Sequence, residues 1–461
     1  MKAAIMAAGE GSRMRSALGA SVFSKLLFPL LGVPIIERVI LAAKRAGIKE
    51  FVVVTGYRGE EIKRYLGEGT KLGVKIQHAF NQQWLKGNAY SLLAARPFLN
   101  PGERFFLFMG DHIFEPALLN AFSEHVIDRV AKCSISDERK HLHFLAVEAC
   151  PPKELDLEEA TKVLSAGEKI TALGKGLKNL NGIDAGMFNF DYSIFDVLEK
   201  ELEDSDGSLS SALQPIIKNE NLEAFSFRDY FWQDIDNYRD LQQARRRLLK
   251  NLVSEKDGVV SRYFNRRLSL AISSRLSRFS VTPNMISLVS FFSCLLSAFL
   301  FILGHSLAGG LIAQLASVID GVDGEIARLK FLESPFGAYL DSILDRYADA
   351  VLIGGIVAGS LLAGVASPLF VLLAGFLALT ASPFSMLAKE KYTNLTGREY
   401  NPLELEGSLS YLPINRDGRL AVIMVGGVLN QLLLTLILLA FLSNLQVIIR
   451  LIVVRKHLST C

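Results

Sequence analysis

The sequence predicts a fold in two parts, an α/β Rossmann-like domain followed by an all-α polytopic membrane domain of about six transmembrane helices. Up to about residue 250, short β-rich apolar runs such as FVVV and FFLFM alternate with amphipathic helical segments, which is typical of βαβ units in a mostly parallel sheet. From about residue 282, one long apolar run follows another, and several reach the roughly 20 residues that span a bilayer. The chain of 461 residues is 50% hydrophobic, with a mean hydropathy of +0.29, which is high for a soluble enzyme.

Three segments follow from this pattern: a cytosolic domain over residues 1–250, a linker helix over 251–281 and a membrane domain over 282–461. In the linker, arginines interleave with apolar residues at helical spacing, as in VVSRYFNRRLSLAISSRLSRF. This pattern favours an amphipathic helix lying on anionic headgroups of the lipid bilayer. A plain basic linker helix is the alternative.

Charges in the connections between the apolar runs orient the membrane domain. The connections around His305, Ala366 and Asn444 carry no nearby Lys or Arg. Basic residues gather at the other ends of the runs, namely Arg328, Lys330, Lys389, Lys391, Arg398, Arg416, Arg419, Arg455 and Lys456. The positive-inside rule places these ends in the cytosol, where an even number of spans also leaves both termini. The N-terminal residues lack the apolar core of a signal peptide, so we expect a multi-pass protein of the cell membrane with its N-terminal domain and active sites in the cytosol.

Composition excludes several classes of partner and site. The 50 Lys and Arg residues nearly balance the 47 Asp and Glu residues, so the charge gives no indication of a nucleic-acid partner. The four cysteines are scattered, without a CxxC pair or a Cys/His cluster. We therefore expect free thiols, and neither a disulfide framework nor a zinc site.

A glycine-rich loop over residues 7–14 follows the first predicted strand. Gly9 and Gly11 let backbone amides approach phosphates closely, and Arg13 and Lys25 can neutralise the charge of a triphosphate. Met14 stands where a dinucleotide-binding fingerprint has its third glycine, and the Gly-Lys-Ser/Thr of a Walker A loop is absent. The loop therefore predicts a nucleotide site of a different kind.

With its surroundings, this loop resembles the sugar-nucleotidyltransferase family over nearly all of residues 1–240. The pieces occur in the family's order: a loop ending in Arg-Met, SKLLFPL, KGNA over 86–89, FFLFMGD ending at Asp111, and WQDID over 232–236. The resemblance implies catalytic roles for Arg13 and Lys25. It implies nucleotide binding by Ala8, Gly9, Gly11, Lys25, Gly87 and Asn88, and acceptor binding by Lys175 and Asp184.

Two carboxylates near this loop are candidate ligands of Mg²⁺. Nucleotidyl transfer uses a magnesium ion that bridges the α-phosphate and the attacking phosphate, and carboxylates suit that cation. We expect Asp111 and Asp236 to bind it, with Asp234 as a substitute for Asp236. A turn role for Asp111 and a capping role for Asp234 are the structural alternatives.

A second set of carboxylates lies in the membrane domain, in DGVDGEIAR and the segment after it. By helical spacing, Asp320 and Asp323 share one helix face, and Gly337, Asp341 and Asp345 share a face of the next helix. Charged residues at the ends of spanning helices are functional by default. Four carboxylates brought together would repel one another, and divalent cations would compensate for their charge.

This pattern is similar to the motif of the CDP-alcohol phosphotransferase family, D-x-x-D-G-x-x-A-R followed by G-x-x-x-D-x-x-x-D, and the likeness covers residues from about 258 to 461. It implies Mg²⁺ ligation at Asp320, Asp323, Asp341 and Asp345, with Asp345 also the general base toward the acceptor hydroxyl. The nucleotide would lie on Gly324, Ala327, Arg328 and Gly337. A homodimer is implied by the resemblance alone, and Asp349, outside the motif, is interpreted as structural.

The fusion indicates two consecutive steps on one chain, as in the family of bifunctional inositol-1-phosphate cytidylyltransferases and di-myo-inositol-phosphate-phosphate synthases. That resemblance implies that CTP and inositol 1-phosphate give CDP-inositol and pyrophosphate. CDP-inositol and a second inositol 1-phosphate then give the phosphodiester product and CMP. Two alternatives stay open: a lipid acceptor for the membrane half, and an N-terminal domain that only binds nucleotide. The basic residues Arg346, Lys389, Lys391, Arg398 and Arg419 could hold a phosphorylated acceptor or be loop charges.

Overall fold

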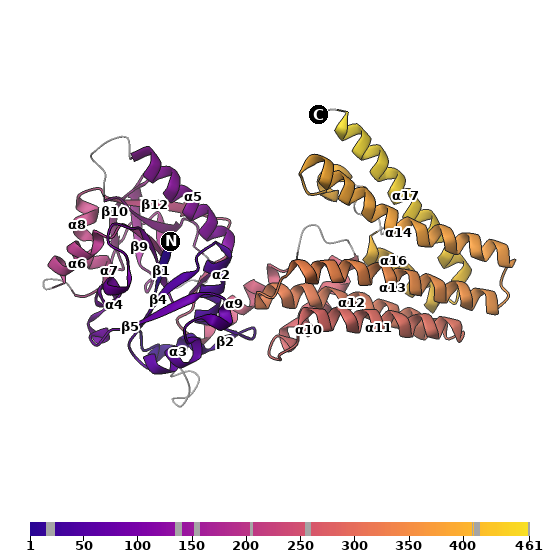
Figure 1. Ribbon diagram of the computed structural model, residues 1–461, viewed down its shortest axis with the longest axis horizontal. Helices are drawn as coiled ribbons and strands as arrows, with labels where there is room; N and C mark the ends of the chain where they lie inside the picture. Colours follow the sequence, from indigo (N-terminus) through magenta and orange to yellow (C-terminus); the bar gives the residue numbers. More distant parts are fainter. Residues whose placement is uncertain are drawn as a thin grey trace. The chain divides into compact units, whose positions relative to one another are not determined.

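The computed structural model describes residues 1–14, 24–133, 141–151, 157–202, 206–253, 260–407, 409 and 415–459. It divides into two compact units, Met1–Arg246 and Arg247–Cys461 (Figure 1). Cys150 and Cys294 are free thiols. Cys461, the side chain of Cys133 and residues 254–259 of the expected linker lie outside the described part.

A nine-stranded sheet forms the first unit, in the order β5-β4-β1-β6-β11-β8-β12-β10-β9. The strands are β1 (Lys2–Ala7), β4 (Glu50–Thr55), β5 (Lys75–Phe80), β6 (Phe105–Met109), β8 (His143–Glu148), β9 (Lys162–Ala166), β10 (Lys169–Gly174), β11 (Gly182–Phe190) and β12 (Leu222–Phe227). Two short antiparallel pairs accompany it, β2 (Pro29–Leu30) with β3 (Val33–Pro34) and β7 (His112–Phe114) with β13 (Trp232–Asp234).

The expectation of a mostly parallel sheet is wrong for the second half of this unit. Strands β5, β4, β1 and β6 are parallel, but β11 runs antiparallel to β6, β8 and β9. Strands β9 and β10 form a hairpin across Gly167, whose φ is +64°. Such a short connection permits only antiparallel pairing, because a parallel crossover needs a dozen or more residues.

Helices cover the sheet of the first unit (Figure 1). They are α2 (Ile35–Arg45), α3 (Gly59–Leu66), α4 (Asn88–Ala94), α5 (Pro116–Cys133), α6 (Ile194–Glu201), α7 (Leu209–Ala212), α8 (Gln214–Lys218) and α9 (Tyr238–Lys250). Because β1 and β6 are parallel neighbours, the glycine loop after β1 and Asp111 after β6 emerge at the same edge of the sheet. This edge carries the candidate site of the first unit.

The second unit is helical. It contains a π-helical turn (Ser261–Asn265), α10 (Arg266–Leu276), α11 (Pro283–Ile302), α12 (Ser306–Lys330), α13 (Pro335–Leu362), α14 (Pro368–Thr396), α15 (Pro402–Leu405), α16 (Arg416–Val428) and α17 (Leu432–Leu458). In the part of the chain that the structure describes, α11, α14 and α17 are long and apolar enough to cross a membrane.

Polar and apolar side chains are distributed in this unit as in a membrane protein. Large apolar residues such as Phe292, Phe376 and Phe441 are exposed, while Ser297 and Gln314 are buried between helices. Small residues bring helices close together, as where Gly355 of α13 faces the backbone of Ala298 in α11. Small residues and polar contacts between helices under an apolar exterior are characteristic of helical membrane proteins.

The expected connection around Asn444 is wrong. The chain turns instead at residues 429–431, and α17 continues through Asn444 as one helix. Asn430 adopts φ +54°, a conformation that Asn tolerates better than most residues. The side chain of Asn444 donates hydrogen bonds to the carbonyls of Leu377 and Ala440, which satisfies the amide within the helix.

Two candidate active sites

The candidate site of the first unit begins at the glycine loop, beside a cavity of about 260 Å³. Gly9, Gly11, Arg13, Lys25 and Asp111 all line it. Gly11 has φ +60°, and a Cβ there would lie 2.6 Å from the Cβ of Lys25. Only glycine therefore permits both this turn and the close approach of the lysine.

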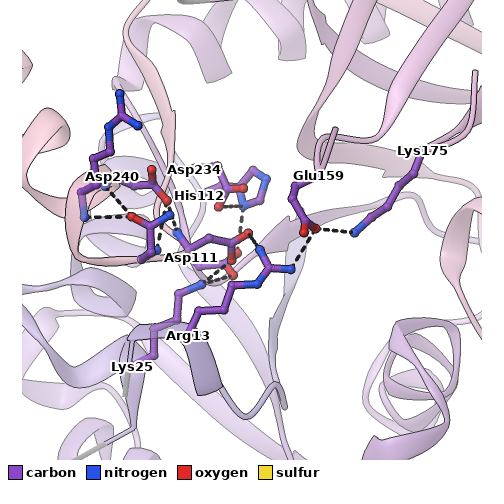
Figure 2. A network of polar contacts seen from close by, with 11 residues as sticks. Arg13, Lys25, Asp111, His112, Glu159, Lys175, Asp234 and Asp240 are labelled. Atoms are coloured by element: carbon purple, nitrogen blue, oxygen red, sulfur yellow. Dashed lines mark hydrogen bonds and ion pairs between the residues drawn. The ribbon is translucent and has the colours of Figure 1, made fainter. Parts of the chain in front are cut away.

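Lys25 lies between the two carboxylates expected to bind metal. Its Nζ is 3.0 Å from Asp111 Oδ2 (Figure 2). The same Nζ is 2.8 Å from Asp236 Oδ1, and Arg13 Nη1 is 3.3 Å from Asp236 Oδ2. Burial opposes the charge of Lys25, but Asp111 and Asp236 raise its pKa above the ordinary value. Burial likewise opposes the charge of Asp111, but Lys25 holds the pKa of that carboxyl well below its usual range. Residues far apart in the sequence thus form one charged cluster.

His112 is a member of this cluster that the sequence analysis missed. Its Nδ1 is 2.8 Å from Asp111 Oδ1 and 3.6 Å from Asp234 Oδ1. Burial would lower the pKa of His112, but Asp234 and Asp111 raise it to about 9. Burial raises the pKa of Asp234 to about 7. The only signal in the sequence is its position directly after Asp111.

The same residues could hold a cation. Asp111, His112 and Asp234 offer ligand atoms within 4.8 Å of one another. Asp234 Oδ1 is buried without a hydrogen-bond partner, as expected for a group that awaits a ligand. The geometry therefore groups Asp234 with Asp111, whereas Asp236 is held by Lys25 and Arg13.

A second cavity of about 320 Å³ contains both predicted acceptor residues, Lys175 and Asp184. Glu159 links this cavity to the glycine loop, because its Oε2 lies 2.8 Å from Arg13 Nη2 and 3.7 Å from Lys175 Nζ (Figure 2). Burial raises the pKa of Asp184 to about 6. A cavity with carboxylates and a cation can bind a phosphorylated polyol.

The expected nucleotide-binding residues Ala8, Gly87 and Asn88 are fixed by backbone contacts. The carbonyl of Ala8 accepts a hydrogen bond from the amide of Tyr57. Asn88 Oδ1 accepts one from the amide of Leu209 at 2.6 Å, and the side chain also lines the second cavity. A Cβ on Gly87, at φ +121°, would lie 2.1 Å from the carbonyl oxygen of Gly207. The KGNA segment is therefore anchored to the start of α7.

In the second unit, α12 and α13 bring the predicted carboxylates together. Asp320, Asp341 and Asp345 offer oxygens within 4.8 Å of one another, and such oxygen donors suit a divalent cation. Asp323 lies in the same cavity as Asp341, and its own oxygens accept hydrogen bonds, Oδ2 from Ser287 Oγ and Oδ1 from the amide of Gly324, both at 2.5 Å.

A cavity of about 330 Å³ adjoins these carboxylates. Asp323 and Asp341 line it, together with the expected nucleotide-binding residues Gly324, Ala327, Arg328 and Gly337. A Cβ on Gly324 would lie 3.3 Å from Arg328 Nη1, and one on Gly337 would lie 3.0 Å from Ser334 Oγ. A side chain at either glycine would therefore crowd the cavity lining.

Arg416 is the residue that the sequence analysis underestimated here, because it was interpreted only as a loop charge. Its Nη1 lies 2.5 Å from Asp320 Oδ2 and 2.7 Å from Asp345 Oδ1. Asp349 pairs with Arg419 at 2.7 Å and accepts from Ser382 Oγ at 2.6 Å. Two arginines at the start of α16, Arg416 and Arg419, therefore balance the negative charge of the acidic faces of α12 and α13.

Comparisons with known proteins match the two halves of the chain to two different families. A nucleotidyl transferase family model matches residues 2–251, and a CDP-alcohol phosphatidyltransferase model matches 280–454. The solved inositol-1-phosphate CTP transferase from T. maritima is 26% identical, with a TM-score of 0.44, over 53% of this chain and 96% of that one. A bifunctional IPC transferase and DIPP synthase from Rubrobacter xylanophilus is 32% identical over 99% of this chain and 97% of its own length. The protein of the same name from Aquifex aeolicus is 31% identical over 98% of both. The chain belongs to the family of bifunctional IPC transferases and DIPP synthases.

Proposed function

We propose that this chain is a bifunctional enzyme that makes di-myo-inositol-phosphate-phosphate in two steps. In the first, a phosphate oxygen of inositol 1-phosphate attacks the α-phosphorus of CTP, and pyrophosphate leaves. In the second, a hydroxyl of another inositol 1-phosphate attacks the phosphorus that carries inositol in CDP-inositol, and CMP leaves. The observation that carries this proposal is the presence of both sites on one chain. That chain matches bifunctional IPC transferases and DIPP synthases over nearly their full length.

In the first site, we assign triphosphate binding to Arg13 and Lys25 and acceptor binding to Lys175 and Asp184. Backbone amides beside Ala8, Gly9 and Gly11 would surround the phosphates. The two adjoining cavities, which share Arg13, Asp111 and Asp236, support this division of roles.

The position of the second carboxylate ligand is also part of the proposal for this site. Bound Mg²⁺ would supply charge stabilisation at the reacting phosphates. We assign Asp111 as one ligand. The buried Oδ1 of Asp234 makes no hydrogen bond and lies near His112 and Asp111, which favours Asp234 over Asp236 as the second.

In the second site, we assign cation binding to Asp320, Asp323, Asp341 and Asp345. The nucleotide would lie along the cavity of Gly324, Ala327, Arg328 and Gly337. Asp345 would accept the proton of the attacking hydroxyl. Its short contact with Arg416 supports this role, because the guanidinium fixes the carboxylate in one orientation.

We propose that residues 1–250 form the cytosolic domain, 251–281 an interfacial helix and 282–461 a multi-pass membrane domain. Six spans would comprise α11, α12, α13, α14, α16 and α17. Helix α16 is the shortest of the six, since its 13 residues rise only about 20 Å. A homodimer in the bilayer, with both sites at the cytosolic surface, completes the proposal.

The distribution of side chains on α10 supports its place at the bilayer surface. Its buried positions are polar, while Leu268 and the flanking Tyr263, Phe264 and Phe279 are exposed. A helix with its polar face inside and its apolar face outside, flanked by arginines, fits an interfacial location.

Purified full-length protein with CTP, inositol 1-phosphate and Mg²⁺, followed by phosphorus NMR, tests the two steps together. We expect pyrophosphate first, then equal amounts of phosphodiester and CMP. Pyrophosphate without CMP would leave only the first step. A second reaction with CDP-inositol and liposomes tests for a lipid acceptor. If the acceptor is a lipid, the product that carries inositol phosphate will be extracted into organic solvent and no soluble phosphodiester will form.

A further inference from the structure

Helix α10, with the π-helical turn before it, presents a polar stripe to the rest of the second unit. Ile272 and Leu276 of α10 lie beside this stripe and pack against apolar side chains of α11 and α12. Every fourth residue from position 261 to 277 is buried, and these residues are Ser261, Asn265, Ser269, Ser273 and Ser277. Residues four apart lie on one helix face. A helix held only by the hydrophobic effect would bury apolar residues on that face instead.

Glu325 of α12 lies at the centre of this polar contact. It is 0% exposed. Its Oε1 accepts hydrogen bonds from Arg266 Nη1 at 2.8 Å and from Ser269 Oγ at 2.6 Å, and its Oε2 accepts one from Ser273 Oγ at 2.6 Å. Three donors of α10 therefore converge on one carboxylate.

The contact continues along α12 toward its N-terminus. Asn265 Nδ2 donates to Ser317 Oγ at 2.9 Å, and Gln314 Nε2 donates to Asn265 Oδ1 at 2.7 Å. Between these bonds and Glu325, α12 has Gly321, where a Cβ would lie 3.3 Å from Arg266 Nη1. From position 314 to 325 the contact covers roughly 16 Å of α12.

The carboxylates Asp320 and Asp323 of the substrate site lie on a different face of α12 from this polar contact. At about 100° per residue, Gly321 lies roughly 100° from Asp320, and Glu325 lies roughly 160° from Asp323. A rotation of α12 about its axis would therefore move the carboxylates out of the site while it strained the bonds to α10.

A buried charge is an inefficient way to stabilise a helix pair. Removing a carboxylate and a guanidinium from water costs several kcal/mol per ion, and well-packed apolar residues often do as well or better. Directional bonds do define a register and a rotation, which apolar contacts define poorly.

We infer that Glu325 is a positioning residue for the phosphotransfer step, which holds α12 at the rotation that presents Asp320 and Asp323 to the substrate cavity. Arg266, Ser269 and Ser273 are its partners on α10. The inference rests on the proposed function of the second site. It assigns a role to Glu325, which occupies a position that the D-G-x-x-A-R motif leaves unspecified.

Glu325→Gln in the full-length protein tests this role, because the amide has the same shape but leaves the Arg266 charge without its counter-charge. We expect pyrophosphate release from CTP to be unchanged. With CDP-inositol supplied, kcat of the second step should fall about ten- to a hundredfold, the loss expected for a displacement of about 1 Å. KM for CDP-inositol should change less than kcat. Glu404→Gln, an exposed glutamate in the same unit, is the matched control and should match the wild type.

The charge-balanced double variant Arg266→Gln/Glu325→Gln separates positioning from simple loss of stability. It restores neutrality and permits an amide–amide hydrogen bond, so it should recover much of the second-step kcat lost in the single variant. Where Glu325→Gln is poorly folded, Ser269→Ala and Ser273→Ala remove one donor each, and each should lower the same kcat by more than its small loss of melting temperature accounts for.

A normal second-step kcat in folded Glu325→Gln would overturn the inference. Equal losses in both steps, or losses that follow the melting temperature across all variants, would also overturn it. Wild-type protein that forms no CMP from CDP-inositol and inositol 1-phosphate would instead refute the proposed function, which is a different result.

Discussion

Replacing the proposed general base by its amide, Asp345→Asn, is the most direct test of the membrane site. Asp345 lies 2.7 Å from Arg416, and Arg416 keeps a second contact at 2.5 Å with Asp320. The variant therefore retains the pairing of Arg416 and the steric shape of the site, but it loses the group that accepts the proton.

General-base catalysis contributes about 10²- to 10⁴-fold to rate, which corresponds to about 3–5 kcal/mol in the activation barrier. One reaction of Asp345→Asn with CTP and inositol 1-phosphate measures both steps, since the first site is unaffected and serves as an internal control. Phosphorus NMR should show pyrophosphate at the wild-type rate, accumulating CDP-inositol, and CMP at least about a hundredfold more slowly. CMP at the wild-type rate in that reaction would refute the assignment of Asp345.

Three further predictions concern the first unit. Lys25→Met should reduce pyrophosphate release by at least about a hundredfold, because it removes a cation at the triphosphate, while CDP-inositol supplied from outside is still converted to CMP. Normal pyrophosphate release would contradict the assignment of Lys25. Gly11→Ala should destabilise the unit by about 1–3 kcal/mol because of its φ of +60° and the approach of Lys25 to 2.6 Å, measured as a lower urea midpoint of Trp84 and Trp232 fluorescence; an unchanged midpoint would show that the loop has another conformation. Burial lowers the pKa of His143 to about 3, below its unfolded value near 6.5, so stability should be unaffected above pH 6.5 and fall by about 2–3 kcal/mol by pH 4.5. His143→Gln should remove this loss in the same fluorescence titration, and an unchanged acid limb in the variant would assign it to other groups.

Residues whose chemistry requires a fixed local spacing are the ones that the sequence reveals. Asp320 and Asp323, and Asp341 and Asp345, recur at helical intervals, so their common faces can be deduced without coordinates. The structure places three of these four in one oxygen cluster. Gly11 is predictable for the same reason, since a tight loop before a helix requires a residue without a Cβ.

His112 and Arg416 could not be predicted in this way. Each belongs to a cluster by tertiary contact alone: Arg416 reaches Asp320 and Asp345 from a helix that starts about 70 residues after Asp345. Asn430 and Asn444 show the same limit for helix boundaries. Both are helix breakers by propensity. Asn444 is acceptable inside α17 because its side chain donates to the carbonyl of Ala440 in the same helix and to that of Leu377 in α14, and only the second is a tertiary contact.

The two candidate sites have different folds and solve one electrostatic problem in the same way. Each gathers carboxylates that repel one another, and each inserts a buried side-chain cation between them: Lys25 between Asp111 and Asp236, and Arg416 between Asp320 and Asp345. Removing one partner of such a pair leaves a charge without compensation, at a cost that solvent reduces because the carboxylates of Asp111 and Asp236 are 30% and 39% exposed. These cations therefore keep the acidic clusters folded before any substrate or metal arrives. A divalent cation held by Asp111, or by Asp320 and Asp345, would supply further positive charge to carboxylates that already contact Lys25 or Arg416.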